Sequence, residues 1–240
     1  LFPPAKLNVA DSVSNYLRFM QGPEKWIVGR FVCSTGKLPE LARELAEHPE
    51  EPFIPVTVVG QASQDRKGWE HALTHDSAAM NKFMAEVENH AEIQAFEIRV
   101  PDHEHIEAYM ADLKGFDEAD VFVELPWSER MDESLSLLAE SEWLNAKART
   151  GGLEASAYPN SDQLAGFIQQ CSNLDLVFKL TAGLQTEFGS HRCFNTPIAE
   201  AAIAGRAISA ARAAAARGGN RIRSSRRFAK LSVADRCEST

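Results

Sequence analysis

Residues 93–126 read IQAFEIRVPDHEHIEAYMADLKGFDEADVFVELP, and this stretch decides the fold. Two short runs within it, 93–100 and 119–126, are rich in apolar and β-branched residues, the composition of buried strands. Between them, residues 103–113 have the composition of a helix. A strand, a helix and a second strand in succession predict a βαβ unit, in which the two strands are parallel.

The same alternation continues in both directions along the chain. We expect strands at 26–33, 53–60, 93–100, 119–126, 144–150 and 176–184. We expect helices at 38–47, 77–90, 103–113, 131–140 and 161–172, with Ser161 as the N-cap of the last one. Because a complete (β/α) barrel needs eight such units, six predict an α/β fold with an incomplete, (β/α)-barrel-like parallel sheet.

Composition and charge divide the chain into two unequal parts. The chain has 240 residues, 44% hydrophobic and 25% charged, which excludes a collagen-like or wholly disordered protein, and we expect no membrane span. Residues 206–240 hold nine basic and two acidic residues, whereas residues 1–205 hold 16 basic and 32 acidic ones. The net charge of −9 is therefore the sum of a basic segment and an acidic one. We expect a barrel-like domain at 1–205 and a flexible basic tail at 206–240, with a helix possible at 198–217.

The cysteine pattern and the charge of the body bear on compartment and partners. The four cysteines (Cys33, Cys171, Cys193 and Cys237) are scattered and no signal peptide is visible, which favours reduced thiols in a cytoplasmic protein. The arginines of the tail are able to neutralise phosphates, but the acidic body opposes the approach of a nucleic acid. We therefore expect no nucleic-acid partner, and the tail reads as an appendage.

Charged side chains sit within the expected strands, near their carboxyl ends. Glu97 and Arg99 share one face of their strand, as do Asn145, Lys147 and Arg149, because side chains in a strand repeat every two residues. Glu124 and Lys179 occupy similar places in two further strands. In a (β/α) barrel this end carries the active site. The surplus of positive charge suits an anionic ligand, while the alternative is a structural layer of ion pairs.

Two of these strands run into glycine-containing turns. Thr150, Gly151 and Gly152 follow Arg149, and Thr181 and Gly183 follow Lys179. Glycine lets backbone N–H groups approach an anion closely, and threonine adds a hydroxyl donor. We expect Arg149, Arg99 and these five residues to bind substrate.

Local motifs around the lysines resemble a known class of enzyme. AKARTGG at 146–152 and LVFKLTAGL at 176–184 are similar to the lysine strands of deoxyribose-phosphate aldolases and related class I aldolase barrels. Here LTAG stands where that family has TSTG. The resemblance implies that Lys179 is a Schiff-base lysine and that Lys147 is the lysine of the preceding strand.

A wider resemblance covers most of the chain. LFPPA at 1–5, WIVGRFVCS at 26–34, AKARTGG at 146–152 and FKLTAGL at 178–184 are similar to motifs of an uncharacterised bacterial protein family. This resemblance implies a (β/α)-barrel-like fold and marks Lys147, Arg149 and Lys179 as motif residues. It names no reaction.

Other reactive side chains carry weaker signals. His71 and His75 fall in a stretch that reads as an exposed connection, and His103 and His105 fall where polar residues begin a helix, so we expect no metal. Cys33 reads either as a reactive thiol near the site or as an inert buried one. We expect no cofactor.

These observations lead to one functional hypothesis and two alternatives. The hypothesis is an enzyme of the lyase or aldolase type that acts on a small anionic (phosphorylated or carboxylated) metabolite. Lys179 and Lys147 are its catalytic lysines, and Glu97 or Glu124 is its general base or orients the lysines. The alternatives are a barrel that binds an anion or a partner without catalysis, and an inactive truncated fragment.

Overall fold

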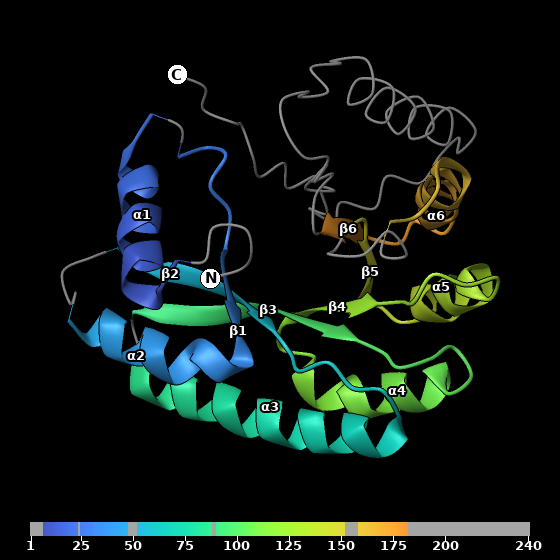
Figure 1. Ribbon diagram of the computed structural model, residues 1–240, viewed down its shortest axis with the longest axis horizontal. Helices are drawn as coiled ribbons and strands as arrows, with labels where there is room; N and C mark the ends of the chain where they lie inside the picture. Colours follow the sequence, from blue (N-terminus) through green and yellow to red (C-terminus); the bar gives the residue numbers. More distant parts are fainter. Residues whose placement is uncertain (1–6, 24, 48–51, 88–89, 152–157, 182–240) are drawn as a thin grey trace. The chain divides into compact units, whose positions relative to one another are not determined.

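A computed structural model describes residues 7–23, 25–47, 52–87, 90–151 and 158–181 of the protein (Figure 1). Its strands run in chain order, β1-β2-β3-β4-β5-β6, in one sheet, and the pairs β1·β2, β2·β3, β3·β4 and β5·β6 are parallel. The predicted α/β fold with a (β/α)-barrel-like parallel sheet is confirmed. The strands are β1 (Phe31–Ser34), β2 (Ile54–Val59), β3 (Ala91–Arg99), β4 (Asp120–Glu124), β5 (Leu144–Arg149) and β6 (Phe178–Thr181).

Helices separate the strands, as a parallel sheet requires. The α-helices are α1 (Val9–Gln21), α2 (Leu38–Ala46), α3 (Arg66–Val87), α4 (Ile106–Asp112), α5 (Met131–Ala139) and α6 (Ser161–Asn173). Two short 3₁₀ helices, η1 (Thr35–Lys37) and η2 (Leu113–Phe116), lead into α2 and follow α4. In the part of the chain that the structure describes, none of these helices combines the length and the apolarity needed to cross a membrane.

The chain forms two compact units, Leu1–Glu124 (unit 1) and Leu125–Thr240 (unit 2). In unit 1, α2, α3 and α4 lie along one side of the strands β1–β4 (Figure 1). Alternate strand residues on that side are fully or almost fully buried, because they pack against the helices. They are Val56, Val58, Phe96, Ile98, Val121 and Val123.

The first helix, α1, has no counterpart among the predicted elements. Asn8 caps it by accepting a hydrogen bond from the N–H of Asp11 at 2.7 Å. The Tyr16 hydroxyl donates to the carbonyl of Gly29 at 2.9 Å, and its ring packs edge-on against Phe31. These contacts hold the segment before β1 outside the sheet. The predicted strand at 26–33 is therefore wrong over its first residues, and the Trp26 side chain is 80% exposed.

Helix α3 begins eleven residues before the predicted start at residue 77. Asp65 accepts a hydrogen bond from the N–H of Gly68 at 2.7 Å, which caps the first turn despite the glycine. Trp69, Met80 and Phe83 then line the buried face of the helix. His71 and His75 consequently lie on a helix and not in a connection, whereas their predicted exposure is confirmed.

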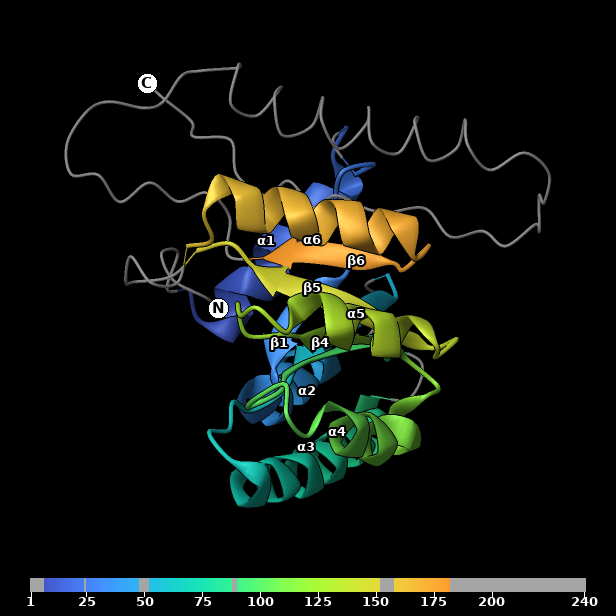
Figure 2. The same cartoon turned by 90° about the vertical axis from the view of Figure 1, so that its right-hand side faces the viewer.

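Unit 2 contains β5, β6, α5 and α6. Figure 2 looks onto its helical side, with α5 and α6 in front of the two strands. Phe167 of α6 packs edge-on against Phe178 of β6 and against Trp127. Asn160, not the predicted Ser161, is the N-cap of α6, and it forms a capping box with Gln163.

Some predictions about the C-terminal part of the chain fall outside the described residues. Among them are the domain boundary between residues 205 and 206 and the helix at 198–217. Both stay predictions.

Candidate functional site

The parallel pairing of β5 with β6 places Lys147 opposite Lys179 and Arg149 opposite Thr181. Register partners on parallel strands point to the same face of a sheet. The opposite face is the one that the helices cover, because Phe178, the register partner of Ala146, contacts Phe167 of α6. Lys147, Lys179 and Arg149 therefore share the face turned away from α5 and α6.

The three cationic side chains differ in their exposure. Lys147 is 6% exposed, Lys179 is half-buried and Arg149 is exposed. Exposure therefore decreases from Arg149 through Lys179 to Lys147.

Hydrogen bonds define the turn that follows β5. The backbone N–H of Thr150 donates to the carbonyl of Thr181 at 2.9 Å, and the Thr150 hydroxyl donates to the same oxygen at 3.1 Å. Arg149 Nε donates to the carbonyl of Gly151 at 3.0 Å, and Trp127 Nε1 donates to the carbonyl of Arg149 at 2.8 Å. The Thr150 hydroxyl proton is thus engaged within the protein, whereas Arg149 is held beside the glycine turn. Gly152 and Gly183 lie outside the described residues.

The other predicted site residues belong to unit 1. Glu97 pairs in register with Phe122, and Arg99 pairs with Glu124, so Glu97, Arg99 and Glu124 share one face of β3 and β4. Glu97 is 2% exposed and Glu124 is 5% exposed, whereas Arg99 is exposed. The shared face of Glu97 and Arg99 follows the predicted two-residue alternation.

The carboxylate of Asp102, which follows β3, was not predicted as a site residue. Asp102 accepts three hydrogen bonds: from the backbone N–H of His105 at 3.0 Å, from the Tyr109 hydroxyl at 2.9 Å, and at 3.1 Å from His105 Nδ1. Burial opposes the charge of Asp102, but these hydrogen bonds outweigh it and lower the pKa of the carboxyl group. Burial and the neighbouring Asp102 raise the pKa of Tyr109 to about 12. The Pro-Asp pair before the helix was the available signal.

A second buried carboxylate, Asp76, also escaped prediction. It lies fully inside unit 1 and accepts hydrogen bonds from Gln61, from the backbone N–H at 2.9 Å and from side-chain Nε2 at 3.2 Å. Burial raises the pKa of Asp76. A Cβ atom at Gly60 would lie 2.6 Å from Asp76 Oδ2, so this strand end needs glycine. The glycine directly after β2 was a usable signal for a close approach.

Cysteine and metal chemistry gain no support. Cys33 is buried, and burial raises the pKa of its thiol to about 12, which disfavours the nucleophilic thiolate. Among the described residues, no three or more His, Cys, Asp or Glu side chains gather in a way that would hold a metal ion.

Comparisons of the chain with protein-family models, with curated proteins and with solved structures gave no match. The case for a function therefore depends on the geometry of the described residues.

Proposed function

We propose that the carboxyl ends of β5 and β6 bind a small anionic metabolite that carries a carbonyl group, and that the protein is an enzyme of the lyase type. The observation that carries this proposal is the register pairing of Lys147 with Lys179 on the face opposite to the one that α6 packs against.

Electrostatics supports an anion as the ligand. Lys147 and Lys179 lie opposite each other on neighbouring strands, which are about 4.8 Å apart, so both ammonium groups belong to the same side of β5 and β6. Arg149 lies two residues further along the same face, and its planar guanidinium matches the two oxygens of a carboxylate or phosphate.

The lysines also supply a nucleophile. In its neutral form, Lys179 Nζ attacks the carbonyl carbon of the substrate. The carbonyl oxygen leaves as water with both amine hydrogens, and a C=N bond remains between the lysine and the substrate. The electron pair of the bond between the α and β carbons is then able to move toward this C=N group, while the proton of the β-hydroxyl group passes to the nitrogen. The α–β bond breaks, an enamine remains on the lysine, and the β carbon leaves as the carbonyl carbon of the second product. Half-burial leaves part of Lys179 accessible to a substrate, and Arg149 lies on the same face of the two strands.

Anion binding without catalysis is the second candidate. The hydrogen bond from Arg149 Nε to Gly151 favours it, because it presents the rest of the guanidinium beside a glycine turn whether or not a lysine reacts. In this reading the lysines contribute charge alone.

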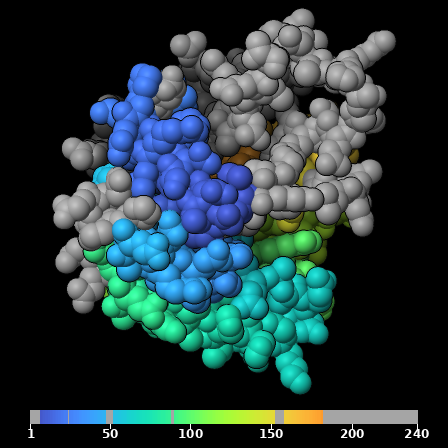
Figure 3. Space-filling view, turned by 60° about the vertical axis from the view of Figure 1, so that its left-hand side comes forward, coloured from blue at the N-terminus to red at the C-terminus, as the bar shows by residue number. Residues whose placement is uncertain are grey.

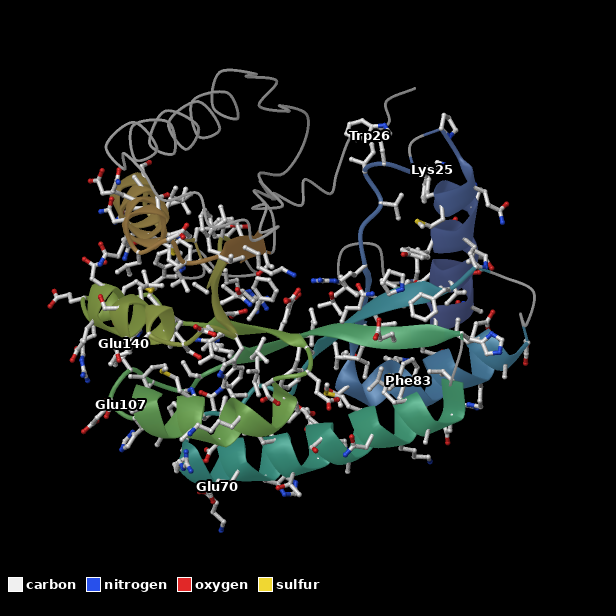
Figure 4. All side chains as sticks on the ribbon, turned by 180° about the vertical axis from the view of Figure 1, so that it is seen from behind. Lys25, Trp26, Glu70, Phe83, Glu107 and Glu140 are labelled. Carbon is white, nitrogen blue, oxygen red and sulfur yellow. The ribbon has the colours of Figure 1, made fainter. Side chains whose placement is uncertain are left out.

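Borohydride trapping distinguishes the two functions. The full chain is incubated with pyruvate, glyoxylate or a phosphorylated aldehyde, reduced with borohydride and mapped by mass spectrometry. The lyase proposal expects an adduct on Lys179 that disappears in Lys179→Met. Lys25→Met is the control, because Lys25 lies on the surface of unit 1 (Figure 4).

Three other outcomes decide against the lyase. Adducts spread evenly over exposed lysines such as Lys25 show nonspecific chemistry and contradict it. No adduct, together with phosphate binding that weakens about tenfold in Arg149→Met, supports the anion-binding candidate. A chain without a cooperative unfolding transition is an inactive fragment and contradicts both functions.

A further inference from the structure

Unit 1 contains a cavity of about 230 Å³ where η1 and α2 meet α3. In Figure 3, α2 is light blue and lies against the turquoise α3. Pro39, Ala79 and Phe83 form an apolar wall, while His75, Lys82 and Glu86 supply polar groups. The cavity is smaller than the roughly 300–1,000 Å³ of a site for a drug-sized ligand, so it suits a smaller molecule.

The buried Asp76 sets the hydrogen bonding of His75. Gln61 Nε2 lies 3.2 Å from Asp76 Oδ1 and 2.6 Å from His75 Nδ1. A carboxylate only accepts, so the amide nitrogen faces Asp76, and its second hydrogen is left for His75 Nδ1. A neutral ring that accepts at Nδ1 carries its own proton on Nε2. The hydrogen bond with Gln61 engages only Nδ1 of His75, so the Nε2–H group is able to donate to a ligand.

Lys82 and Glu86 place both signs of charge at the same cavity. They form an i,i+4 ion pair on α3 with Lys82 Nζ 3.7 Å from Glu86 Oε1, and both side chains are exposed. Exposed pairs of this kind contribute little stability and open readily. A ligand with a single charge would take one partner and leave the other unpaired. A ligand with both charges satisfies both.

We propose that this cavity binds a small zwitterion with an apolar side chain, the chemistry of an apolar α-amino acid. Its carboxylate pairs with Lys82 and accepts from His75 Nε2–H, and its ammonium group pairs with Glu86. Its side chain packs on Pro39, Ala79 and Phe83. The site lies wholly in unit 1 and is independent of the function proposed for unit 2.

Calorimetric titration of the full chain with L-leucine tests the proposal. Two matched ligands lack one charge each: 4-methylpentanoate has no ammonium group and 3-methylbutylamine has no carboxylate. We expect saturable leucine binding, and affinity about tenfold or more weaker for each matched ligand. Absence of saturable leucine binding by the folded protein overturns the proposal. Equal binding of all three ligands also overturns it, because it shows an apolar groove without charge recognition.

Variants on one helix assign the binding to this cavity. Lys82→Met and Glu86→Gln are each expected to weaken leucine binding about tenfold. Glu70→Gln is the matched control, because Glu70 also has an i,i+4 cationic partner on α3 but points away from the sheet, whereas Phe83 faces it (Figure 4). All three substitutions change exposed side chains, so each variant should keep its unfolding transition. Unchanged binding in Lys82→Met and Glu86→Gln, or equal loss in Glu70→Gln, places any leucine site elsewhere and refutes the proposal.

Discussion

Asp76 is a single residue whose burial has a measurable consequence for stability. Its side chain has no exposed surface, and burial raises its pKa from the ordinary value of 3.8. The folded protein therefore binds this proton more tightly than the unfolded chain does. Between the ordinary and the raised pKa, the folded state holds more protons, so the contribution of Asp76 to the free energy of unfolding falls as pH rises.

Asp76→Asn isolates this effect, because asparagine does not titrate. We expect the free energy of unfolding of the wild type, minus that of the variant, to decrease as pH rises from about 4 through the raised pKa. Urea unfolding of both proteins at a series of pH values measures the difference, and the other titrating groups cancel in the subtraction. A difference that stays constant or grows with pH would contradict the raised pKa.

Tyr109 and Tyr16 allow a second comparison between single residues. The Tyr109 hydroxyl donates to the Asp102 carboxylate and that of Tyr16 to a neutral carbonyl, each at 2.9 Å. Hydrogen bonds to charged acceptors are the stronger ones. We expect Tyr109→Phe to lower the free energy of unfolding by about 1.5–3 kcal/mol and Tyr16→Phe by about 1 kcal/mol. Equal losses in chemical denaturation would argue against a charged Asp102.

At the scale of single elements, α6 shows how sequence and structure differ by one residue. Both Asn160 and Ser161 are good N-cap residues, and only the backbone conformation decides between them. Asn160 has an extended backbone and accepts from the N–H of Gln163 at 2.8 Å. A sequence pattern alone does not distinguish neighbouring candidates of this kind.

Paired substitutions test this cap. We expect Asn160→Ala to lower the free energy of unfolding by about 1 kcal/mol, because it removes the side-chain acceptor of the capping box. Ser161→Ala is the control and should change it by no more than about 0.5 kcal/mol. Urea unfolding monitored by circular dichroism measures both free energies. A larger loss in Ser161→Ala than in Asn160→Ala would identify Ser161 as the N-cap.

The prediction of the elements succeeded where periodicity was strong and failed where local signals conflicted. The start of α2 at Leu38 was predicted correctly, because its leucines follow the helical spacing. Helix α3 begins before its predicted start at residue 77, because the capping contact between Asp65 and the N–H of Gly68 is visible only in three dimensions. The true start of β1 depends on the contact between Tyr16 and Phe31, which lie far apart in the sequence.

The candidate site was accessible to sequence reasoning only in part. Lys147 and Lys179 were placed near each other because consecutive strands of a βα chain pair in parallel, and their register now makes them direct partners. Asp76 was not predicted, because it lies within a helix and its partner Gln61 precedes that helix across a loop. Counting the predicted strands shows how much of a (β/α) barrel is present, but it does not identify the reaction.

For the whole molecule, the charge asymmetry gives a further prediction. We expect deletion of residues 206–240 to leave the unfolding transition unchanged, because their Arg, Gly, Ser and Ala residues offer little apolar surface to a core. The deletion also changes the formal net charge from −9 to −16. Thermal unfolding and isoelectric focusing of both chains measure these effects. A clear fall in the midpoint would show that the tail belongs to the folded structure.

The strand order of unit 1 has a consequence for synthesis of the protein on the ribosome. β1, β2, β3 and β4 pair in the order in which they leave the exit tunnel, so each new strand finds its neighbour already made. No strand must wait for a distant segment, and loop closure costs remain small at every step. The nascent chain is therefore able to extend its sheet vectorially, one βα unit at a time, with a short-lived exposed edge.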